Sequence, residues 1–253
     1  MIFKSLMIAY FGVSSLFIAE FAALVTAQAA VKEQAYEYYS HGHLSLAARL
    51  PLEGPGWVKL FQPRARLWGT DQLVQVIQKV ALYLESTFSP RDRLQIGDMA
   101  AQQGGYVSGH ASHQNGLDVD IAFFRKQQTE QDPDDTRGFV KHFVRSGKLS
   151  SDFDLERNWA LVKALVSTGK VKRIFTDAAV KSALCKYSAA RGDKNYYTQA
   201  LRRIQPWPNH DDHFHVRLVC PAGTRHCISQ SDPPAGTGCD RIYTALPGSI
   251  EMP

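Results

Sequence analysis

Apolar side chains recur at helical spacing along the stretch that follows Thr70. The apolar positions there are Leu73, Val74, Ile77, Val80, Ala81 and Leu84. Because residues three and four apart share one face of a helix, this pattern predicts an amphipathic helix with one buried face. Thr70 or Asp71 can cap the N-terminus of that helix, and Ser89-Pro90 is expected to end it.

Three further helices are predicted downstream. The segment 158–175 (NWALVKALVSTGKVKRIF) predicts a helix that ends near Gly169 and leads into a strand. Asp177 can cap another helix. The segment 193–204 (DKNYYTQALRRI) is also helix-like, and the Pro-Trp-Pro sequence at 206–208 is expected to halt it.

Alternating apolar and polar residues predict two strands, at 117–124 (LDVDIAFF) and 214–220 (FHVRLVC). A shorter strand is expected at 94–100 (LQIGDMA), and short strands among loops are expected at 40–61, which is rich in glycine and proline. No internal repeat or interdomain linker is evident. We therefore expect one α+β domain with a central antiparallel sheet flanked by helices.

Residues 1–29 predict a secretory signal peptide. A lone Lys4 precedes an apolar run from Met7 to Val25, which ends in the small-x-small pattern Ala27-Gln28-Ala29. No later segment is long and apolar enough to span a bilayer. Residues 30–253 are therefore expected to form the mature, exported domain, without a stable membrane span.

Four cysteines remain after the leader: Cys185, Cys220, Cys227 and Cys239. An even number in an exported chain predicts two disulfides, with three pairings open. The spacing of Cys220 and Cys227 suits a small closed loop, which would leave Cys185 with Cys239 to tie the C-terminal tail to the body. A structural zinc site is the alternative, but no C-x-x-C pair is present.

The composition is that of an ordinary soluble globular protein, with 44% hydrophobic and 21% charged residues. The formal net charge of +5 suits a polyanionic neighbour, or simply favours solubility. Basic residues are scattered, and no Lys/Arg-rich block or RNA-binding motif occurs, so a nucleic-acid partner is not expected. An exported basic protein is more readily matched to a polymer of the cell wall or envelope. The oligomeric state is not predicted.

The two predicted strands carry charged groups on one face each. Side chains alternate across a strand, so Asp118 and Asp120 share a face of the first strand. His213, His215 and Arg217 share a face of the second by the same argument. If the two strands are adjacent, two imidazoles meet two carboxylates.

Two more histidines, His110 and His113, lie in a glycine-flanked turn that can fold back over the first strand. Five of the nine histidines of the chain therefore fall in two short segments, with His110 and His113 in the first and His210, His213 and His215 in the second. Three His or Asp ligands with a fourth position left to water is the pattern of catalytic zinc. Taken singly, each residue has a plainer interpretation, because a lone Asp or His is more often a hydrogen-bonding or surface group. No H-E-x-x-H or P-loop pattern is present.

A family resemblance appears in these residues. The arrangement H-x6-D from His113 to Asp120, followed by H-x-H at His213 and His215, resembles zinc peptidases of the lysostaphin, D-alanyl-D-alanine peptidase and hedgehog group. More specifically, SGHASHQNGLDVDI with HDDHFHVRLVCP resembles the penicillin-insensitive murein endopeptidases. The likeness includes LPLEGPGWVKL near residue 50 and VKRIFTDAAVKSALC at 171–185, so it covers most of the mature chain.

The resemblance implies three zinc ligands, which are His113, Asp120 and His215. It also implies that His213 faces the substrate and that His110 and His210 crowd the same site, with His110 either in the metal shell or in the pocket lining. Relatives carry a further metal contact in the segment equivalent to 152–158, but here SDFDLERN has no histidine. Family members also often have another cysteine pair, so one tether is missing.

The resulting hypothesis is a periplasmic zinc endopeptidase that hydrolyses D-alanyl–diaminopimelyl and similar peptide cross-links of peptidoglycan. His213 would accept the proton of the attacking water and pass it to the leaving amine. His210, or His110, would help to hold the oxyanion. Asp118 would orient a histidine through its free N–H or, equally, would be a strand-edge carboxylate.

Two alternatives stay open. One is a D,D-carboxypeptidase or dipeptidase, although such relatives use a glutamate base before the last histidine, where this chain has Asp212-His213. The other is a non-catalytic metal-binding or wall-binding protein, which would have no need of His213 beyond the ligands.

Overall fold

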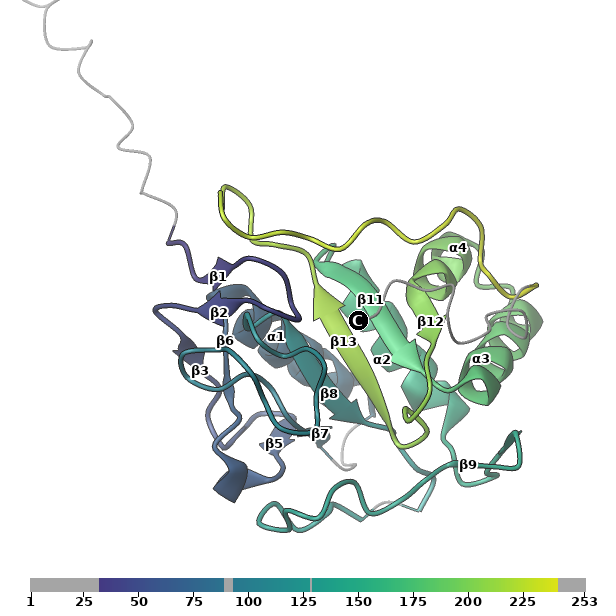
Figure 1. The fold of residues 1–253 in the computed structure, drawn as a ribbon. Coiled ribbons are helices and arrows are strands. Elements are labelled where there is room, and N and C mark those ends of the chain that lie inside the picture. The colour runs from purple at the N-terminus through teal and green to yellow at the C-terminus, as the bar shows by residue number, and fades with distance from the viewer. Residues whose placement is uncertain (1–31, 89–92, 128, 241–253) are drawn as a thin grey trace, which may run out of the picture. The chain divides into compact units, whose positions relative to one another are not determined.

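A seven-stranded mixed sheet forms the centre of the protein (Figure 1). The computed structural model describes residues 32–88, 93–127 and 129–240. The strand order is β12-β11-β13-β8-β7-β5-β4. The strands are β4 (Glu53–Gly54), β5 (Trp57–Lys59), β7 (Leu94–Ile96), β8 (Asp118–Ala122), β11 (Val171–Thr176), β12 (Ile204–Pro206) and β13 (His213–Leu218).

The pairing within this sheet changes from its middle to its flanks. The four middle strands, β11, β13, β8 and β7, are antiparallel neighbours. Toward the two edges, β12 runs parallel to β11 and β5 runs parallel to β7. The predicted α+β class is therefore confirmed, and the antiparallel arrangement holds for the centre of a sheet that is mixed overall.

The part of the chain that the structure describes also contains short two-stranded sheets and a 3₁₀ turn. Three two-stranded sheets pair β1 (Ala35–Tyr36) with β2 (His43–Leu44), β3 (Ala48–Arg49) with β6 (Trp68–Gly69), and β9 (Val144–Arg145) with β10 (Lys148–Leu149). The 3₁₀ turn η1 spans Gln62–Arg64. The expectation of short strands among the loops of 40–61 is thus confirmed.

The helices of the described residues are α1 (Asp71–Phe88), α2 (Leu155–Ser167), α3 (Ala178–Arg191) and α4 (Lys194–Arg203). The Thr70 hydroxyl accepts a hydrogen bond from the Leu73 N–H at 3.2 Å, so Thr70 caps α1. Asp177 caps α3 as predicted, by accepting from the Ala179 N–H at 2.6 Å. The Ser89-Pro90 stop signal lies outside the described residues.

Helix α2 begins three residues before the predicted segment. Asp154 supplies the cap, because its carboxylate accepts from the Arg157 N–H at 3.0 Å. The apolar pattern alone did not reveal this start, since Arg157 and Asn158 are polar residues buried in the first turn. Asn158 is satisfied there by hydrogen bonds to the backbone of Phe124.

The main hydrophobic core lies between the sheet and the helices. In Figure 1, α1 and α2 lie behind β8, β13 and β11. The apolar faces of β8 and β13 are buried in this core, together with residues of α1 and α2; examples are Val119, Ile121, Phe214, Val216, Ile77 and Leu161. Each fully buried side chain of this size contributes about 1.5–3 kcal/mol to folding. The opposite face of the same strands is left for polar groups.

Strand β12 was not predicted, because Pro206 indicated only the end of a helix. Helix α4 does end at Arg203, and the chain then pairs with β11 from Ile204 to Pro206. β12 is the first strand in the sheet order and has a neighbour on one side only. An edge strand tolerates proline because its missing N–H is not needed by a second neighbour.

Both disulfides are formed in the described part of the chain. Cys220 is bonded to Cys227, and Cys185 in α3 is bonded to Cys239. This is the pairing that loop spacing favoured among the three possibilities. The alternative of a cysteine zinc site is wrong, since all four sulfurs are oxidised.

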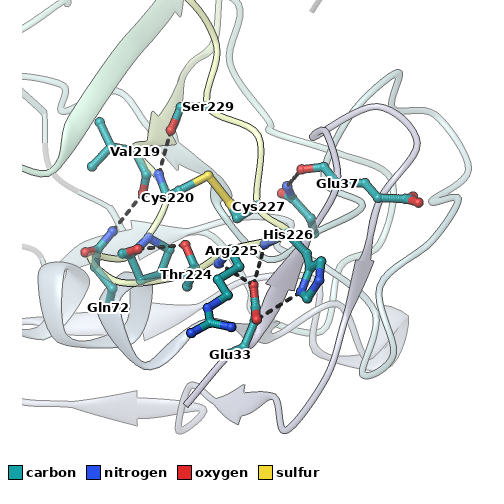
Figure 2. The surroundings of a disulfide bond; sticks show 12 residues. Glu33, Glu37, Gln72, Val219, Cys220, Thr224, Arg225, His226, Cys227 and Ser229 are labelled. Carbon is teal, nitrogen blue, oxygen red and sulfur yellow. Dashed lines mark hydrogen bonds and ion pairs between the residues drawn. A yellow bond between two sulfur atoms is a disulfide. The ribbon is translucent and has the colours of Figure 1, made fainter. Parts of the chain in front are cut away.

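The loop between Cys220 and Cys227 is fastened to the segment that precedes the first strand. The Glu33 carboxylate accepts hydrogen bonds from the backbone N–H groups of Arg225 at 2.8 Å and His226 at 2.7 Å (Figure 2). The disulfide therefore holds a loop that in turn holds the N-terminal end of the described chain.

The predicted signal peptide, residues 1–29, lies outside the described residues. Among the residues that the structure describes, no helix has the length and apolar character needed to cross a membrane.

Candidate metal centre

Strands β8 and β13 bring the predicted site residues together. The two strands pair so that His215 lies opposite Asp120 and Arg217 lies opposite Asp118. The adjacency on which the sequence argument depended is therefore present. Because successive side chains alternate, these four groups share the face turned away from the main core.

A tight loop carries His113 to the same face. The His113 backbone is left-handed, with φ of 66°, and its N–H donates to Asp118 Oδ2 at 3.1 Å. Such a conformation costs of order 1–3 kcal/mol for a residue with a side chain, so surrounding contacts must maintain it. Gly116 ends the loop with φ of 74°, where an added Cβ would lie 2.6 Å from the Leu44 side chain. The lack of a side chain at Gly116 therefore allows the loop to pack closely against Leu44.

One carboxylate oxygen is the centre of the cluster. Asp120 Oδ1 lies 3.3 Å from His113 Nε2, 3.5 Å from His215 Nδ1 and 3.5 Å from His213 Nε2. A tetrahedral site with metal–ligand bonds of about 2.0–2.1 Å has edges of about 3.3–3.4 Å. The distances from Asp120 Oδ1 to His113 Nε2 and to His215 Nδ1 therefore match the ligand–ligand edges of such a site.

Several of these atoms are buried without a hydrogen bond. His113 is fully buried, and neither ring nitrogen has a hydrogen-bond partner. Asp120 Oδ1 and His215 Nε2 are in the same condition. Leaving one such group unsatisfied costs about 1–3 kcal/mol. The orphaned atoms of His113 and Asp120, with His215 Nδ1 beside them, fit a divalent cation such as zinc, which accepts nitrogen and oxygen ligands.

His110 lies on the side of Asp120 that faces Asp98. Its Nδ1 is 3.8 Å from Asp120 Oδ2, and its Nε2 is 3.0 Å from Asp98 Oδ2. His110, His113 and Asp120 each place one potential ligand atom within 4.8 Å of the others. His110 is therefore positioned either as a further ligand or as a wall of the site, as the sequence left open.

A role of Asp98 at the site was not predicted from the sequence, in which the segment 94–100 was expected only to form a short strand. Its carboxylate is buried and also accepts hydrogen bonds from Arg64 at 2.8 Å and Arg66 at 2.9 Å. Two guanidinium groups thus hold the carboxylate that contacts His110. An acidic residue two positions after the end of a buried strand was the available signal for a role at the site.

His213 faces the cluster with one nitrogen and a second carboxylate with the other. Its Nδ1 is hydrogen-bonded to Asp212 Oδ1 at 2.5 Å, while its Nε2 points to Asp120. The Phe139 ring stacks on the imidazole at 4.9 Å between centroids. Ring and carboxylate together restrict the orientation of His213. The contributions of Asp212 and Phe139 were not predicted.

His210 closes another side of the site. Its ring centroid lies 4.9 Å from that of His213 and 5.7 Å from that of His215. Its Nδ1 is 2.7 Å from the Pro208 carbonyl oxygen, so the Nδ1–H tautomer donates there and leaves Nε2 free. All five predicted histidines and Asp120 are therefore gathered in one region.

Burial and neighbouring charges set the protonation states of Asp120 and the histidines around it. Burial acts to raise the pKa of Asp120, but the neighbouring His113 and His213 hold it well below its usual range. Burial lowers the pKa of His215 to about 3 and that of His210 to about 4. Asp120 is therefore ionised and His215 neutral near pH 7, which are the states that bind metal.

The pKa of His213 is shifted in the opposite direction, upward. Burial acts to lower its pKa, but the charge of Asp120 and the hydrogen bond to Asp212 outweigh burial, so the pKa is raised. A raised pKa makes the imidazole a stronger proton acceptor than an ordinary histidine.

Asp118 supports the site from beneath. It is fully buried on a strand that lies between β13 and β7, so its interpretation as a strand-edge carboxylate is wrong. Arg217 donates to both of its oxygens, at 2.8 and 3.1 Å, and His215 Nε2 lies 3.6 Å away. Asp118 thus contacts the backbone of one ligand loop and the ring of His215.

The segment 151–158, which contains no histidine, has structural contacts in this protein. Asp152 forms an ion pair with Lys141, and Asp154 caps α2 while it binds the Arg157 side chain at 2.9 Å. These carboxylates are already engaged by cations.

The chain matches the penicillin-insensitive murein endopeptidase family over residues 35–246. It is 33% identical over 210 residues to the protein of that name from Haemophilus influenzae, covering 81% of this chain and 71% of the relative. The Klebsiella pneumoniae protein is 36% identical over 214 residues, or 79% and 72% of the two chains. The Pectobacterium atrosepticum protein is 32% identical over 213 residues, or 82% and 72%. Given a family match over most of its length, the chain belongs to the penicillin-insensitive murein endopeptidase family.

Proposed function

We propose that this protein is a zinc endopeptidase that hydrolyses the D-alanyl–diaminopimelyl and similar peptide cross-links of peptidoglycan in the periplasm. The observation that carries the proposal is Asp120 Oδ1 with His113 Nε2 at 3.3 Å and His215 Nδ1 at 3.5 Å, beside His213 Nε2 at 3.5 Å. Family membership and the basic net charge support the substrate, and the leader predicted at residues 1–29 supports export.

Zinc would be held by His113, Asp120 and His215, with His110 able to join them. Bound zinc supplies Lewis-acid chemistry, because it polarises a scissile carbonyl and lowers the pKa of water from about 15.7 to about 7. His213 and His210 border these ligands, with their ring centroids 4.9 Å apart, so water would attack beside them.

His213 acts as the proton carrier in this proposal. Its Nε2 faces the metal ligands, and its Nδ1 is occupied by Asp212, so the proton of water is accepted at Nε2. The same nitrogen then returns the proton to the leaving amine. His210 donates from Nε2 toward the carbonyl oxygen only in a tautomer that gives up the hydrogen bond to Pro208, whereas His110 reaches the site from the other side.

This chemistry forms no acyl-enzyme, because water attacks the peptide directly. β-Lactams that trap a serine nucleophile therefore have no target in the site, and cleavage should be unaffected by penicillin.

Purified protein incubated with cross-linked muropeptide dimers tests the proposal. Dimers should become monomers, cleavage should stop in a chelator, and added zinc should restore it. His113→Ala should abolish cleavage, whereas His41→Ala, which changes an exposed histidine outside the site, should not. Turnover that survives complete removal of metal would end the proposal.

Product masses separate the alternatives. A D,D-carboxypeptidase or dipeptidase would release D-alanine or a dipeptide and leave the dimer linked. A non-catalytic binding protein would retain zinc and bind muropeptides without any product.

A further inference from the structure

A cationic hairpin stands beside the start of β13. Strands β9 and β10 are joined by Ser146 and Gly147, whose φ values of 48° and 70° belong to a tight hairpin turn. Arg145 and Lys148 are direct partners across this hairpin, and both are exposed. In the described part of the chain, neither forms an ion pair with a carboxylate.

Directly opposed like charges destabilise an antiparallel pair. The hairpin therefore holds two cations in a repulsive arrangement that an anion between them would relieve. Arg145 also opposes protonation of His142, which places its charge close to that imidazole.

A cavity of about 520 Å³ opens on this hairpin. Its lining includes Lys141, His142, Arg145, Lys148, Ser150 and Ser151. Lys141 is paired with Asp152, so the cations left for a ligand are Arg145 and Lys148, with hydroxyl groups beside them. The cavity thus offers charge and hydrogen-bond donors to a carboxylate.

A neighbouring pocket and His142 connect the cavity to residues that contact His213. A second pocket shares Lys141 with this cavity and is lined by Phe139 and Asp212, the two residues that hold His213. His142 Nδ1 lies 3.0 Å from Asp211 Oδ1 and 3.7 Å from Asp212 Oδ2. Through His142 and Asp212, the hairpin lies near the Nδ1 side of His213, the residue that would protonate the leaving amine from Nε2.

We propose that Arg145 and Lys148 form a subsite for free carboxylates of the peptide strand that contributes the leaving amine. This inference rests on the proposed function. A diaminopimelyl residue keeps a carboxylate on the carbon that bears the cross-linked nitrogen, so an anion accompanies the leaving group. Arginine and lysine are the side chains that recognise such groups.

Two dimer substrates test the subsite, one with free carboxylates and one with these groups amidated. The double variant Arg145→Gln with Lys148→Gln should raise the KM for the free dimer roughly tenfold with little change in kcat, as expected for two lost charge-assisted contacts. Amidation should raise the wild-type KM to a similar degree and should not affect the variant further. The control Lys79→Gln with Lys170→Gln removes the same charge elsewhere and should behave as wild type.

Lys148→Glu separates binding from stability. It places an opposite charge across from Arg145, so the melting temperature should stay equal or rise while affinity for the free dimer falls. A purely structural role for the hairpin would move both in the same direction. A variant that still distinguishes free from amidated dimers as wild type does overturns the subsite.

Titration of chelator-treated protein with intact dimer separates this inference from the proposed function. If no dimer is ever cleaved but Arg145→Gln with Lys148→Gln weakens dimer binding, the subsite stands and the endopeptidase proposal fails. If the variant loses salt-sensitive binding to whole sacculi but binds dimers normally, the hairpin recognises the polyanionic wall and the peptide subsite is wrong.

Discussion

Asp118 and Arg217 face each other across β8 and β13 as a buried, two-pronged ion pair. Arg217 is 1% exposed and also lies 3.3 Å from the centroid of the Tyr39 ring. The pair sits directly beneath the proposed ligands His113 and His215. It links the stability of the central sheet to the shape of the site.

Removal of one partner of this pair should be strongly destabilising. Arg217→Met leaves a buried carboxylate without its counter-charge, so the free energy of unfolding should fall by about 3–5 kcal/mol in urea denaturation. The double variant Asp118→Asn with Arg217→Met should recover part of that loss, because no isolated charge remains. Equal losses in the single and double variants would mean that the ion pair is not the source of the effect.

The protein should hold about one zinc ion per chain, because the proposed His and Asp ligands form a single site. Dialysed protein analysed by mass spectrometry for metals should show this ratio, and His215→Ala should lower zinc affinity at least about a hundredfold. Asp232→Asn, which changes an exposed carboxylate paired with Lys172, is the matched control. A stable ratio of two would contradict the inference drawn from the missing histidine in 151–158.

Asp212 should act as a positioning residue for His213. Asp212→Asn should lower kcat about 10–100-fold, as expected for a lost outer-shell partner, while zinc content stays unchanged. Asp212→Glu should restore part of the rate, because a carboxylate is again available to Nδ1. Nitrogen chemical shifts of the His213 ring should report the change of tautomer, which a merely structural effect on the loop would not produce.

Lys59 should make stability depend on pH. It is 1% exposed, and burial lowers its pKa to about 8, against the attraction of Asp98 and Asp120. Below the folded pKa, the charge is buried at a cost. Between about pH 8 and the ordinary lysine value of about 10.4, the unfolded chain binds the proton that the folded chain releases, so stability rises with pH.

Lys59→Met should therefore raise the free energy of unfolding at pH 7 by about 1–3 kcal/mol and remove this rise toward pH 10. Urea denaturation at pH 7 and pH 9.5 measures both effects, with the exposed Lys79→Met as control. A loss of stability at pH 7 would show that the hydrogen bond from Lys59 to the Leu60 carbonyl outweighs the cost of burial.

The disulfide between Cys185 and Cys239 should stabilise the fold through its long loop. It joins residues 54 apart, against 7 for Cys220 and Cys227. Replacement of both Cys185 and Cys239 by serine should lower the free energy of unfolding by about 2–4 kcal/mol, and the shorter bridge should matter less. Denaturant unfolding of this variant and of the variant with serine at both Cys220 and Cys227 distinguishes the effect of loop length from that of local packing.

The local patterns of the chain predicted the elements well because they depend on near neighbours. The period of two in LDVDI and HFHVRL placed the charged side chains on common faces, and Thr70 and Asp177 marked helix starts. Family motifs added the set His113, Asp120 and His215. These signals act over a few residues, so they survive without knowledge of the fold.

Other features required the tertiary structure, because they depend on contacts between distant segments. Asp98 contacts His110 because β7 pairs with β8 in the folded sheet. Phe139 stacks on His213 from a loop that shows no periodicity. The edge position that admits Pro206 to a strand is a property of the whole sheet. Sequence alone determined which groups could bind a metal and on which faces they lie. Pairing and burial then decided which atoms meet and which lose water, since register and desolvation arise only when remote parts of the chain are packed together.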